Sequence, residues 1–99
     1  MNYNIPWVVI RDISKFAKKN SIEKVILFGS RARGTNCKRS DIDIAVIGGN
    51  INGFYWDIME NMESLLSFDI VDIDSGVSEE LAREIERDSV TIYDKDRQF

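Results

Sequence analysis

Apolar and polar residues alternate along this chain in blocks that predict helices and strands in turn. From Pro6 to Asn20 the apolar residues recur at helical spacing, and Pro6 suits the first turn of that helix. Residues 24–28 form a short, almost wholly apolar run, which predicts a strand buried on both faces. Residues 41–46 alternate between small or acidic and aliphatic side chains, which predicts a second strand with one aliphatic face.

The middle of the chain predicts a connector followed by a helix. Gly48–Gly53 joins the second strand to a helix expected at about Tyr55–Leu66. Such a loop can close over a base or contact a partner, although a plain connector whose following aromatic residues anchor the helix is the simpler interpretation. Apolar residues form one stripe of the helix, which we expect to be core: Tyr55, Ile58, Met59, Met62, Leu65 and Leu66.

The last third of the chain predicts a strand, a helix and a second strand. Phe68–Asp74 reads as a strand, and Ser78 suits the N-cap of a helix whose residues Leu81 and Ile85 face inward. Val90–Tyr93 then forms a short final strand. The whole pattern predicts an α/β fold, with a small mixed sheet flanked by helices, in one domain that covers residues 1–99.

The segment Gly29-Ser30-Arg31-Ala32-Arg33-Gly34 follows the first apolar strand directly. Gly29 permits a sharp turn and a close approach of a ligand to the backbone. Ser30 suits an N-cap, the next residues suit one or two helical turns, and Gly34 suits a stop. Free N–H groups at such a helix start favour phosphate oxygens. Taken alone, an ordinary turn before a solvated basic helix explains the segment equally well.

Two carboxylates, Asp41 and Asp43, begin the second strand. Residues two apart on a strand point to the same side, so these two anions repel each other unless a cation lies between them. Carboxylate oxygens select a hard cation such as magnesium, manganese or calcium. An isolated Asp-x-Asp is more often a loop cap beside a solvated acid. Its place downstream of the glycine-serine turn makes the metal site the better interpretation.

A third acid is needed to hold two ions or to act as a base. The strand Phe68–Asp74 offers Asp69 on one face, and Asp72 and Asp74 on the other. The sequence does not say which face meets the first pair. Asp69 is the first choice, because an acid between two large apolar residues is costly to bury without a partner. Asp72 is the alternative, and Asp74 reads as a turn residue.

Composition limits the classes of function that remain. The net charge of −4 argues against broad binding to nucleic acid, although the basic cluster Arg31–Arg39 is compatible with a nucleotide. Cys37 is the only cysteine and there is no histidine, which argues against a disulfide, a zinc site and a cysteine nucleophile. No apolar run approaches the ~20 residues that span a bilayer, so we expect a soluble cytoplasmic protein.

Together, the segments at 29–34, 40–46 and 68–72 make the chain resemble the minimal nucleotidyltransferases of the polymerase-beta superfamily. The resemblance extends over essentially the whole chain, to the closing Ser89–Tyr93, and is closest to the single-domain group paired with HEPN-domain toxins. A kinase-like P-loop fits worse, because Thr35-Asn36 stands where Lys-Ser/Thr should follow.

The resemblance implies a palm-like fold and a role for each of the quoted residues. Gly29 and Ser30 are expected at the triphosphate of ATP, with Arg31 and Arg33 nearby as nucleotide-binding candidates. The metal ligands and catalytic residues are expected to be Asp41, Asp43 and Asp69, with two magnesium ions held by the first two and Asp69 activating the acceptor hydroxyl. Lys38 and Arg39 are further basic residues of this segment, but each is as well explained as a solvated loop charge.

These roles describe transfer of AMP from ATP to a hydroxyl group. Resemblance to the toxin-paired group favours a tyrosine of a HEPN-domain toxin, so that the chain would be an antitoxin that acts by adenylylation. The alternative is a non-catalytic module that neutralises or stabilises a partner by contact. Modification of a small molecule such as an antibiotic is weaker, because the chain has no room for a second substrate-binding domain.

Overall fold

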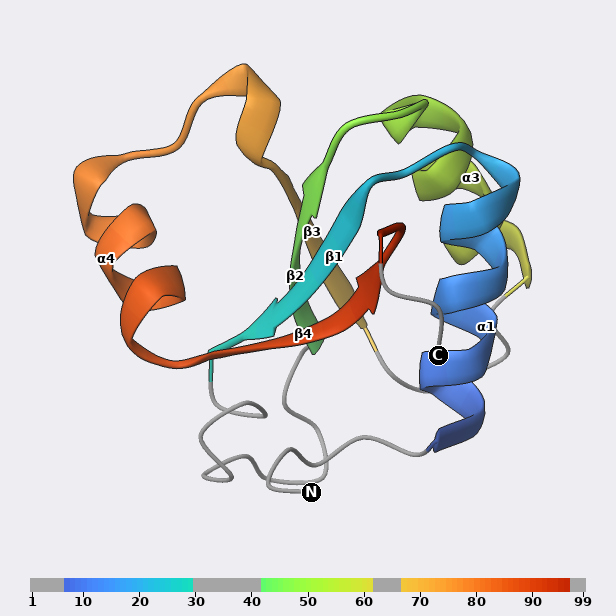
Figure 1. Ribbon diagram of the computed structural model, residues 1–99, viewed down its shortest axis with the longest axis horizontal. Helices are drawn as coiled ribbons and strands as arrows, with labels where there is room; N and C mark the ends of the chain where they lie inside the picture. Colours follow the sequence, from blue (N-terminus) through green and yellow to red (C-terminus); the bar gives the residue numbers. More distant parts are fainter. Residues whose placement is uncertain (1–6, 30–41, 62–66, 97–99) are drawn as a thin grey trace.

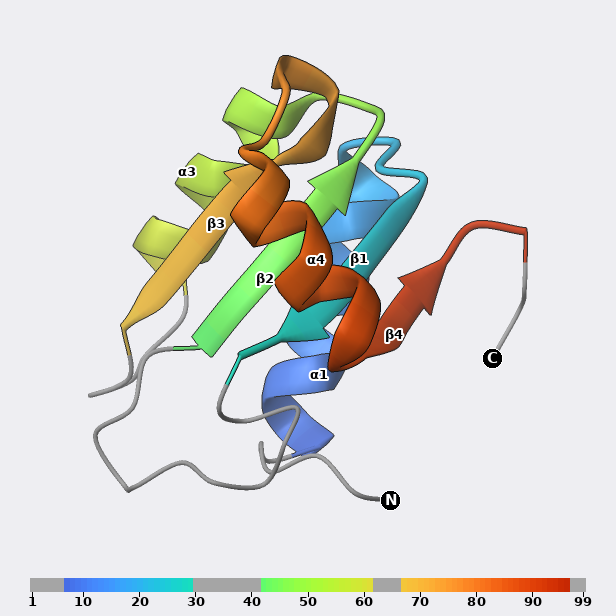
Figure 2. The same ribbon diagram turned by 90° about the vertical axis from the view of Figure 1, so that its left-hand side faces the viewer.

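The computed structural model describes residues 7–29, 42–61 and 67–96 of the chain (Figure 1). They form a four-stranded sheet with helices on both faces, as Figures 1 and 2 show. The helices are α1 (Trp7–Lys19), α3 (Ile51–Asn61), α4 (Glu79–Arg87) and a short 3₁₀ turn, η1 (Ile73–Ser75). The strands are β1 (Lys24–Phe28), β2 (Ile42–Ile47), β3 (Phe68–Asp72) and β4 (Ser89–Asp94). The predicted α/β class with a small mixed sheet is confirmed.

The order of the strands in the sheet is β3-β2-β1-β4. Strand β1 pairs antiparallel with both β2 and β4, whereas β2 and β3 pair in parallel. A central strand has neighbours on both sides and layers on both faces, which explains why residues 24–28 are apolar almost throughout. Because β1 runs opposite to β2 and β3, the end of β1 and the beginnings of β2 and β3 meet at one end of the sheet.

Two apolar clusters cover the two faces of the sheet. On one face, Ile42, Ile44 and Val46 of β2 pack in the larger cluster with residues of α1 and α3. On the other face, Ala45 packs in a smaller cluster with Phe28 and Ile85 of α4. The alternation read from residues 41–46 is therefore the alternation between these two clusters.

Helix α3 corrects the predicted apolar stripe. The helix begins at Ile51 rather than near Tyr55, and its buried residues are Phe54 and Ile58. Tyr55 and Met59, which were expected in the core, are 41% and 42% exposed. The stripe was wrong because the helical spacing allowed two phases, and Phe54 belongs to the one that the sheet covers. The predicted stripe residues Met62, Leu65 and Leu66 lie outside the described residues.

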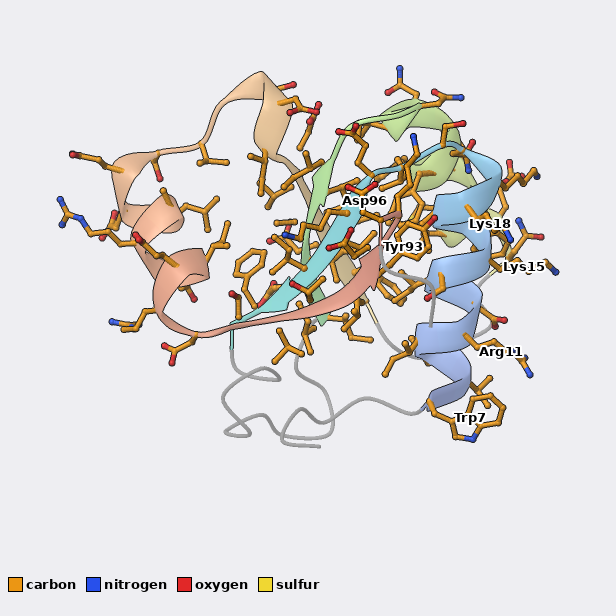
Figure 3. All side chains as sticks on the ribbon, in the orientation of Figure 1. Trp7, Arg11, Lys15, Lys18, Tyr93 and Asp96 are labelled. Carbon is orange, nitrogen blue, oxygen red and sulfur yellow. The ribbon has the colours of Figure 1, made fainter. Side chains whose placement is uncertain are left out.

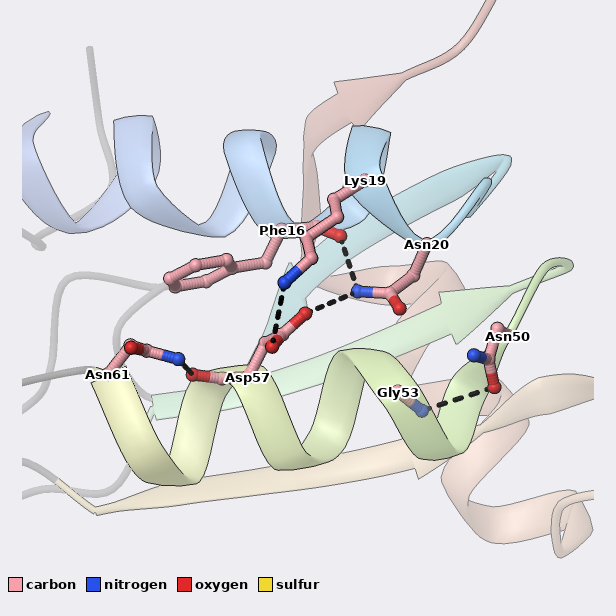
Figure 4. A network of polar contacts seen from close by, with 7 residues as sticks. All are labelled: Phe16, Lys19, Asn20, Asn50, Gly53, Asp57 and Asn61. Atoms are coloured by element: carbon pink, nitrogen blue, oxygen red, sulfur yellow. Dashed lines mark hydrogen bonds and ion pairs between the residues drawn. The ribbon is translucent and has the colours of Figure 1, made fainter.

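The connector after β2 is shorter than the predicted Gly48–Gly53, since its last residues belong to α3. Two hydrogen bonds hold it: the Gly48 N–H donates to the Asp74 carboxylate at 2.7 Å, and the Asn50 N–H donates to the Asn20 carbonyl at 2.8 Å. The Asn50 side chain also accepts from the Gly53 N–H at 3.1 Å (Figure 4). The segment is a structured turn that leads from β2 into α3 and is hydrogen-bonded to Asn20, the residue that follows α1.

The strand predicted at Phe68–Asp74 ends at Asp72, where the chain turns into η1, and the last helix and strand agree with the sequence. Helix α4 is capped by Ser78, whose hydroxyl accepts from the Leu81 N–H at 3.1 Å, and Ile85 is buried beneath it. Strand β4 contains the predicted strand at residues 90–93. None of the helices among the described residues has the length and apolar character needed to cross a membrane.

Helices α1 and α3 are joined by a polar seam around Asp57 (Figure 4). The Asn20 amide donates to the Asp57 carboxylate at 2.8 Å, and the Lys19 ammonium lies 3.4 Å from its other oxygen. The same Asn20 amide donates to the Phe16 carbonyl at 2.8 Å, which orients it. These donors, the Asn20 amide above all, lower the pKa of Asp57 below its ordinary value of 3.8, against the opposing effect of partial burial.

The seam predicts a dependence of stability on pH. Because the pKa of Asp57 is lower in the folded chain than in the unfolded one, its stabilising contribution is complete above pH 3.8 and is lost as the pH falls below that value. Asp57→Asn should therefore unfold more easily than the wild type at pH 6, and the difference should shrink below pH 3.8. Urea titrations of both proteins at pH 6 and at several values below pH 3.8 measure this difference in the free energy of unfolding. A difference that does not vary with pH would contradict the assignment.

The phase of α3 gives a second prediction. Phe54 is fully buried, so Phe54→Ala should lower the free energy of unfolding by about 3–5 kcal/mol. Tyr55→Ala, one residue along and exposed, should cost less than about 1 kcal/mol. Chemical denaturation of the two variants tests whether Phe54, and not Tyr55, is the buried aromatic residue of α3. Equal losses in the free energy of unfolding would contradict this and favour the predicted stripe.

Candidate active site

Three side chains form a row across the end of the sheet where β1 finishes and β2 and β3 begin. Phe28 of β1 is the register partner of Asp43 in β2, and Asp43 is the register partner of Asp69 in β3. Neighbouring strands lie about 4.8 Å apart, and side chains of in-register residues project from the same face. The two carboxylates are therefore neighbours beside Phe28, on the face that α4 covers.

The sequence did not say which face of the strand at residues 68–74 meets the first carboxylates, and the register of β2 and β3 now shows it. Phe68 and Ile70 pack against the larger cluster and Val71 against the smaller one. Asp69 therefore shares the face of Val71, which is also the face of Asp43. Asp69 is exposed and Asp43 is half-buried, so solvent or a ligand reaches this pair.

The other two acids of this segment have structural partners. Asp72 caps η1, accepting from the Asp74 N–H at 3.0 Å and from the Ser75 hydroxyl at 2.7 Å. Asp74 accepts from Gly48, as described above, and is the turn residue that the sequence indicated. Asp72 also pairs in register with Val46, at the opposite end of β2 from Asp43. The geometry thus brings Asp69, and not Asp72, next to Asp43.

Gly29 lies directly against the Asp43 carboxylate. Its φ is +79°, a conformation that residues with a side chain rarely adopt. A Cβ at this position would overlap the nearer carboxylate oxygen of Asp43 and would lie 3.2 Å from the carboxylate carbon. The sequence suggested Gly29 only as a turn that lets a ligand approach. Its contact with Asp43 was missed, because it becomes visible only once the register of β1 and β2 is known.

Several predicted site residues lie outside the described residues: Ser30, Arg31, Arg33 and Asp41, together with Lys38 and Arg39. Among the described residues, no group of three histidine, cysteine or acidic side chains is arranged to hold a metal ion. The pair of Asp43 and Asp69 nevertheless fits a hard divalent cation. Adjacent carboxylates are stabilised by positive charge between them, and their oxygens are the ligands that magnesium prefers.

The profile of one protein family, described as polymerase beta, nucleotidyltransferase, matches residues 11–98 of the chain. The chain belongs to this family. Among curated proteins, none matches the chain. The matched residues of this nucleotidyltransferase include every element described above except the first turns of α1, and they contain the whole row of Phe28, Asp43 and Asp69.

Several solved structures with the same fold come from toxin–antitoxin complexes. A chain from a toxin–antitoxin structure with AMP-PNP aligns with a TM-score of 0.69 and 24% identity, over 87% of this chain and 73% of that one. A chain from a complex of tri-AMPylated Shewanella oneidensis HEPN toxin with MNT antitoxin aligns with a TM-score of 0.63 and 20% identity, over 91% and 73%. A chain from an MntA-HepT toxin–antitoxin structure aligns with a TM-score of 0.63 and 20% identity, over 92% of this chain and 74% of that one. At these identities the likeness concerns the fold.

The contact between Gly29 and Asp43 leads to a prediction on stability. Gly29→Ala should lower the free energy of unfolding by about 1–3 kcal/mol from backbone strain, and by more because the new methyl group displaces the Asp43 carboxylate. Gly76→Ala is the matched control, since Gly76 also has a positive φ, of +96°, but a Cβ there would meet nothing within 4 Å. Chemical denaturation of both variants separates strain from displacement.

A double-mutant cycle completes this test. With Asp43→Ala already present, Gly29→Ala should cost about 0.5–3 kcal/mol less than it does in the wild type, because the clashing carboxylate is gone. An additive cycle would show that Gly29 does not hold Asp43 in place.

Proposed function

We propose that this nucleotidyltransferase is metal-dependent and transfers AMP from ATP to a tyrosine hydroxyl of a HEPN-domain toxin, acting as a cytoplasmic antitoxin. The observation that carries the proposal is the in-register pair of Asp43 and Asp69 beside Gly29. Two carboxylates on adjacent strands combine the functions that nucleotidyl transfer requires: anchoring cations at the triphosphate and accepting a proton from the attacking hydroxyl.

In the proposed site, Asp41 and Asp43 hold two magnesium ions and Asp69 is the base. Gly29 and Ser30, with Arg31 and Arg33, bind the triphosphate. The magnesium ions supply Lewis-acid stabilisation of charge on the phosphate oxygens. Gly29 leaves room for the Asp43 carboxylate. Phe28, the register partner of Asp43 in β1, is buried and supports Asp43 from that side.

The proposed reaction is an in-line displacement at the α-phosphorus. The acceptor oxygen forms a bond to the α-phosphorus, and the bond from that phosphorus to the α–β bridging oxygen breaks. Pyrophosphate leaves with the bonding electron pair, and the acceptor proton passes to the Asp69 carboxylate. Asp69 suits this step because it is the exposed member of the pair, so that a hydroxyl reaches it from solvent.

The choice of acceptor rests on the similar structures. One of them is described as containing AMP-PNP and another as a tri-AMPylated HEPN toxin with its MNT antitoxin.

Substitution of single carboxylates tests the proposal. Asp43→Asn and Asp69→Asn should each lower the rate of AMP transfer about 100-fold or more, because one removes a metal-holding charge and the other removes the base. Asp72→Asn is the matched control in the same strand. It should keep its transfer rate and lose less than about 1 kcal/mol of stability, because an asparagine oxygen can still accept from the Asp74 N–H.

The assay incubates the chain, magnesium and ATP with a purified HEPN-domain toxin, the partner that the proposal names. Label from the α-phosphate should appear on that protein and label from the γ-phosphate should not, and chelation of magnesium should stop the transfer. Toxin neutralisation that survives Asp43→Asn in full would favour the non-catalytic module instead. Loss of transfer in Asp72→Asn with full activity in Asp69→Asn would reverse the assignment of the base.

A further inference from the structure

The exposed large apolar side chains of the described residues all lie on two helices. They are Trp7 and Val8 on α1, and Tyr55, Trp56 and Met59 on α3. Trp56 is 60% exposed and meets the Tyr55 ring edge to face at 5.7 Å. Single exposed apolar residues are ordinary, but several grouped on neighbouring elements are typical of a surface that another molecule covers.

Helix α1 adds a line of positive charge to the same layer. Trp7, Arg11, Lys15 and Lys18 follow one another along the outward side of the helix, as Figure 3 shows. The Arg11 guanidinium lies 5.3 Å from the centre of the Trp7 ring, so the line begins with a cation–π pair. Within the described residues, neither Lys15 nor Lys18 forms an ion pair, and both side chains are exposed.

The two helices present one surface rather than two. They pack side by side on the same face of the sheet and run in opposite directions, and the Asp57 seam joins them (Figure 4). Phe54 and Ile58 are the buried residues of α3, and Trp56 is two residues, about 200° of helix, from each of them, so it points away from the sheet. The outer face of this layer, hereafter the helical face, is cationic along α1 and aromatic along α3.

We propose that the helical face is the docking surface for the acceptor protein, which meets it with acidic side chains over α1 and apolar side chains over α3. This inference rests on the proposed function, which requires a protein partner. Trp, Tyr, Met and Arg are the residues enriched in protein interfaces, and the helical face contains all of them. The line of cations spans residues 11–18, about 10 Å of helix, which matches two turns of an acidic helix.

Charge decides between a protein and a nucleic acid as the occupant. The chain has a net charge of −4, and three cations on one helix neutralise too few phosphates to hold a duplex against that charge. An acidic protein surface needs no more than local complementarity, and it alone also covers the three apolar residues of α3. The charge pattern therefore favours a protein with a mixed acidic and apolar surface.

The helical face and the row of Phe28, Asp43 and Asp69 share one end of the sheet, although they lie on opposite faces of it. Helix α1 is joined to β1 by a short turn and runs opposite to it, so Trp7 lies at the same end of the molecule as Gly29 (Figure 1). The row itself lies on the other face of the sheet. A partner on the helical face would therefore reach the site around this end of the sheet, where α1 begins.

The experiment measures the affinity of the chain for a purified HEPN-domain toxin, the acceptor of the proposed function, by calorimetry without ATP. Lys15→Glu/Lys18→Glu should weaken binding at least about tenfold, and Trp56→Ser about thirtyfold, because an aromatic anchor at the centre of an interface contributes most to affinity. Arg83→Glu/Arg87→Glu on α4 is the matched control with the same change in charge, and it should bind within about twofold of the wild type. All of the changed side chains are exposed, so thermal unfolding should show folded variants.

The outcomes separate this inference from the proposed function. Asp43→Asn should bind like the wild type and transfer no AMP. If the helical-face variants bind normally while Asp43→Asn loses transfer, the docking inference is wrong and the enzyme stands. If these variants lose binding but the wild type transfers no AMP, the docking inference is supported and the proposed transfer of AMP is wrong. Absence of a wild-type complex, or wild-type binding to a 30-base-pair duplex that Lys15→Glu/Lys18→Glu abolishes, would overturn the inference.

Discussion

The parallel pairing of β2 with β3 is the constraint on which the rest of this molecule depends. It aligns Asp43 with Asp69 and so produces the carboxylate pair. Parallel strands also need a connection that crosses from one end of the sheet to the other, and here α3 is that connection. The same pairing that creates the site therefore creates the helix against which α1 packs.

The pairing also separates the candidate active site from the proposed docking surface. Alternation along β2 sends Ile42, Ile44 and Val46 toward α1 and α3, whereas Asp43 and its register partner Asp69 lie on the face of α4. Because the larger cluster lies under the helical face, the surface there is stiffly supported. The side of the carboxylate row has only the smaller cluster, and Asp69 stays exposed. The proposed docking surface and the candidate active site therefore lie on opposite sides of one sheet, the first over the larger cluster and the second over the smaller one.

Much of the fold was predictable from the sequence where a residue has one feasible environment. Lys24–Phe28 was predicted with its observed bounds, because an apolar run of that length suits only a buried strand. Ser78 was predicted as a cap, because serine before two glutamates is a strong local signal. In α3, by contrast, Phe54 and Tyr55 are adjacent aromatic residues, and hydropathy alone does not distinguish which of them the sheet covers.

The candidate site was predictable in its residue types but not in its contacts. The alternation of residues 41–46 and the position of Asp69 identify acids, yet their proximity depends on a register between strands 26 residues apart, 43 to 69. The overlap of a Gly29 side chain with Asp43 depends on a second register, between β1 and β2. Such non-local alignments follow from how the whole sheet packs, and no short motif encodes them.

The position of β4 has a consequence for how the chain acquires its structure during synthesis. The row of Phe28, Asp43 and Asp69 comes from β1, β2 and β3, so all three residues exist before α4 and β4 are made. Until residues 89–94 emerge, however, β1 has one side of its backbone unpaired, and every residue of that strand except Lys24 is apolar. An unpaired apolar edge is a site of aggregation. The nascent chain is therefore vulnerable at β1, and the step that protects it is the addition of its last strand.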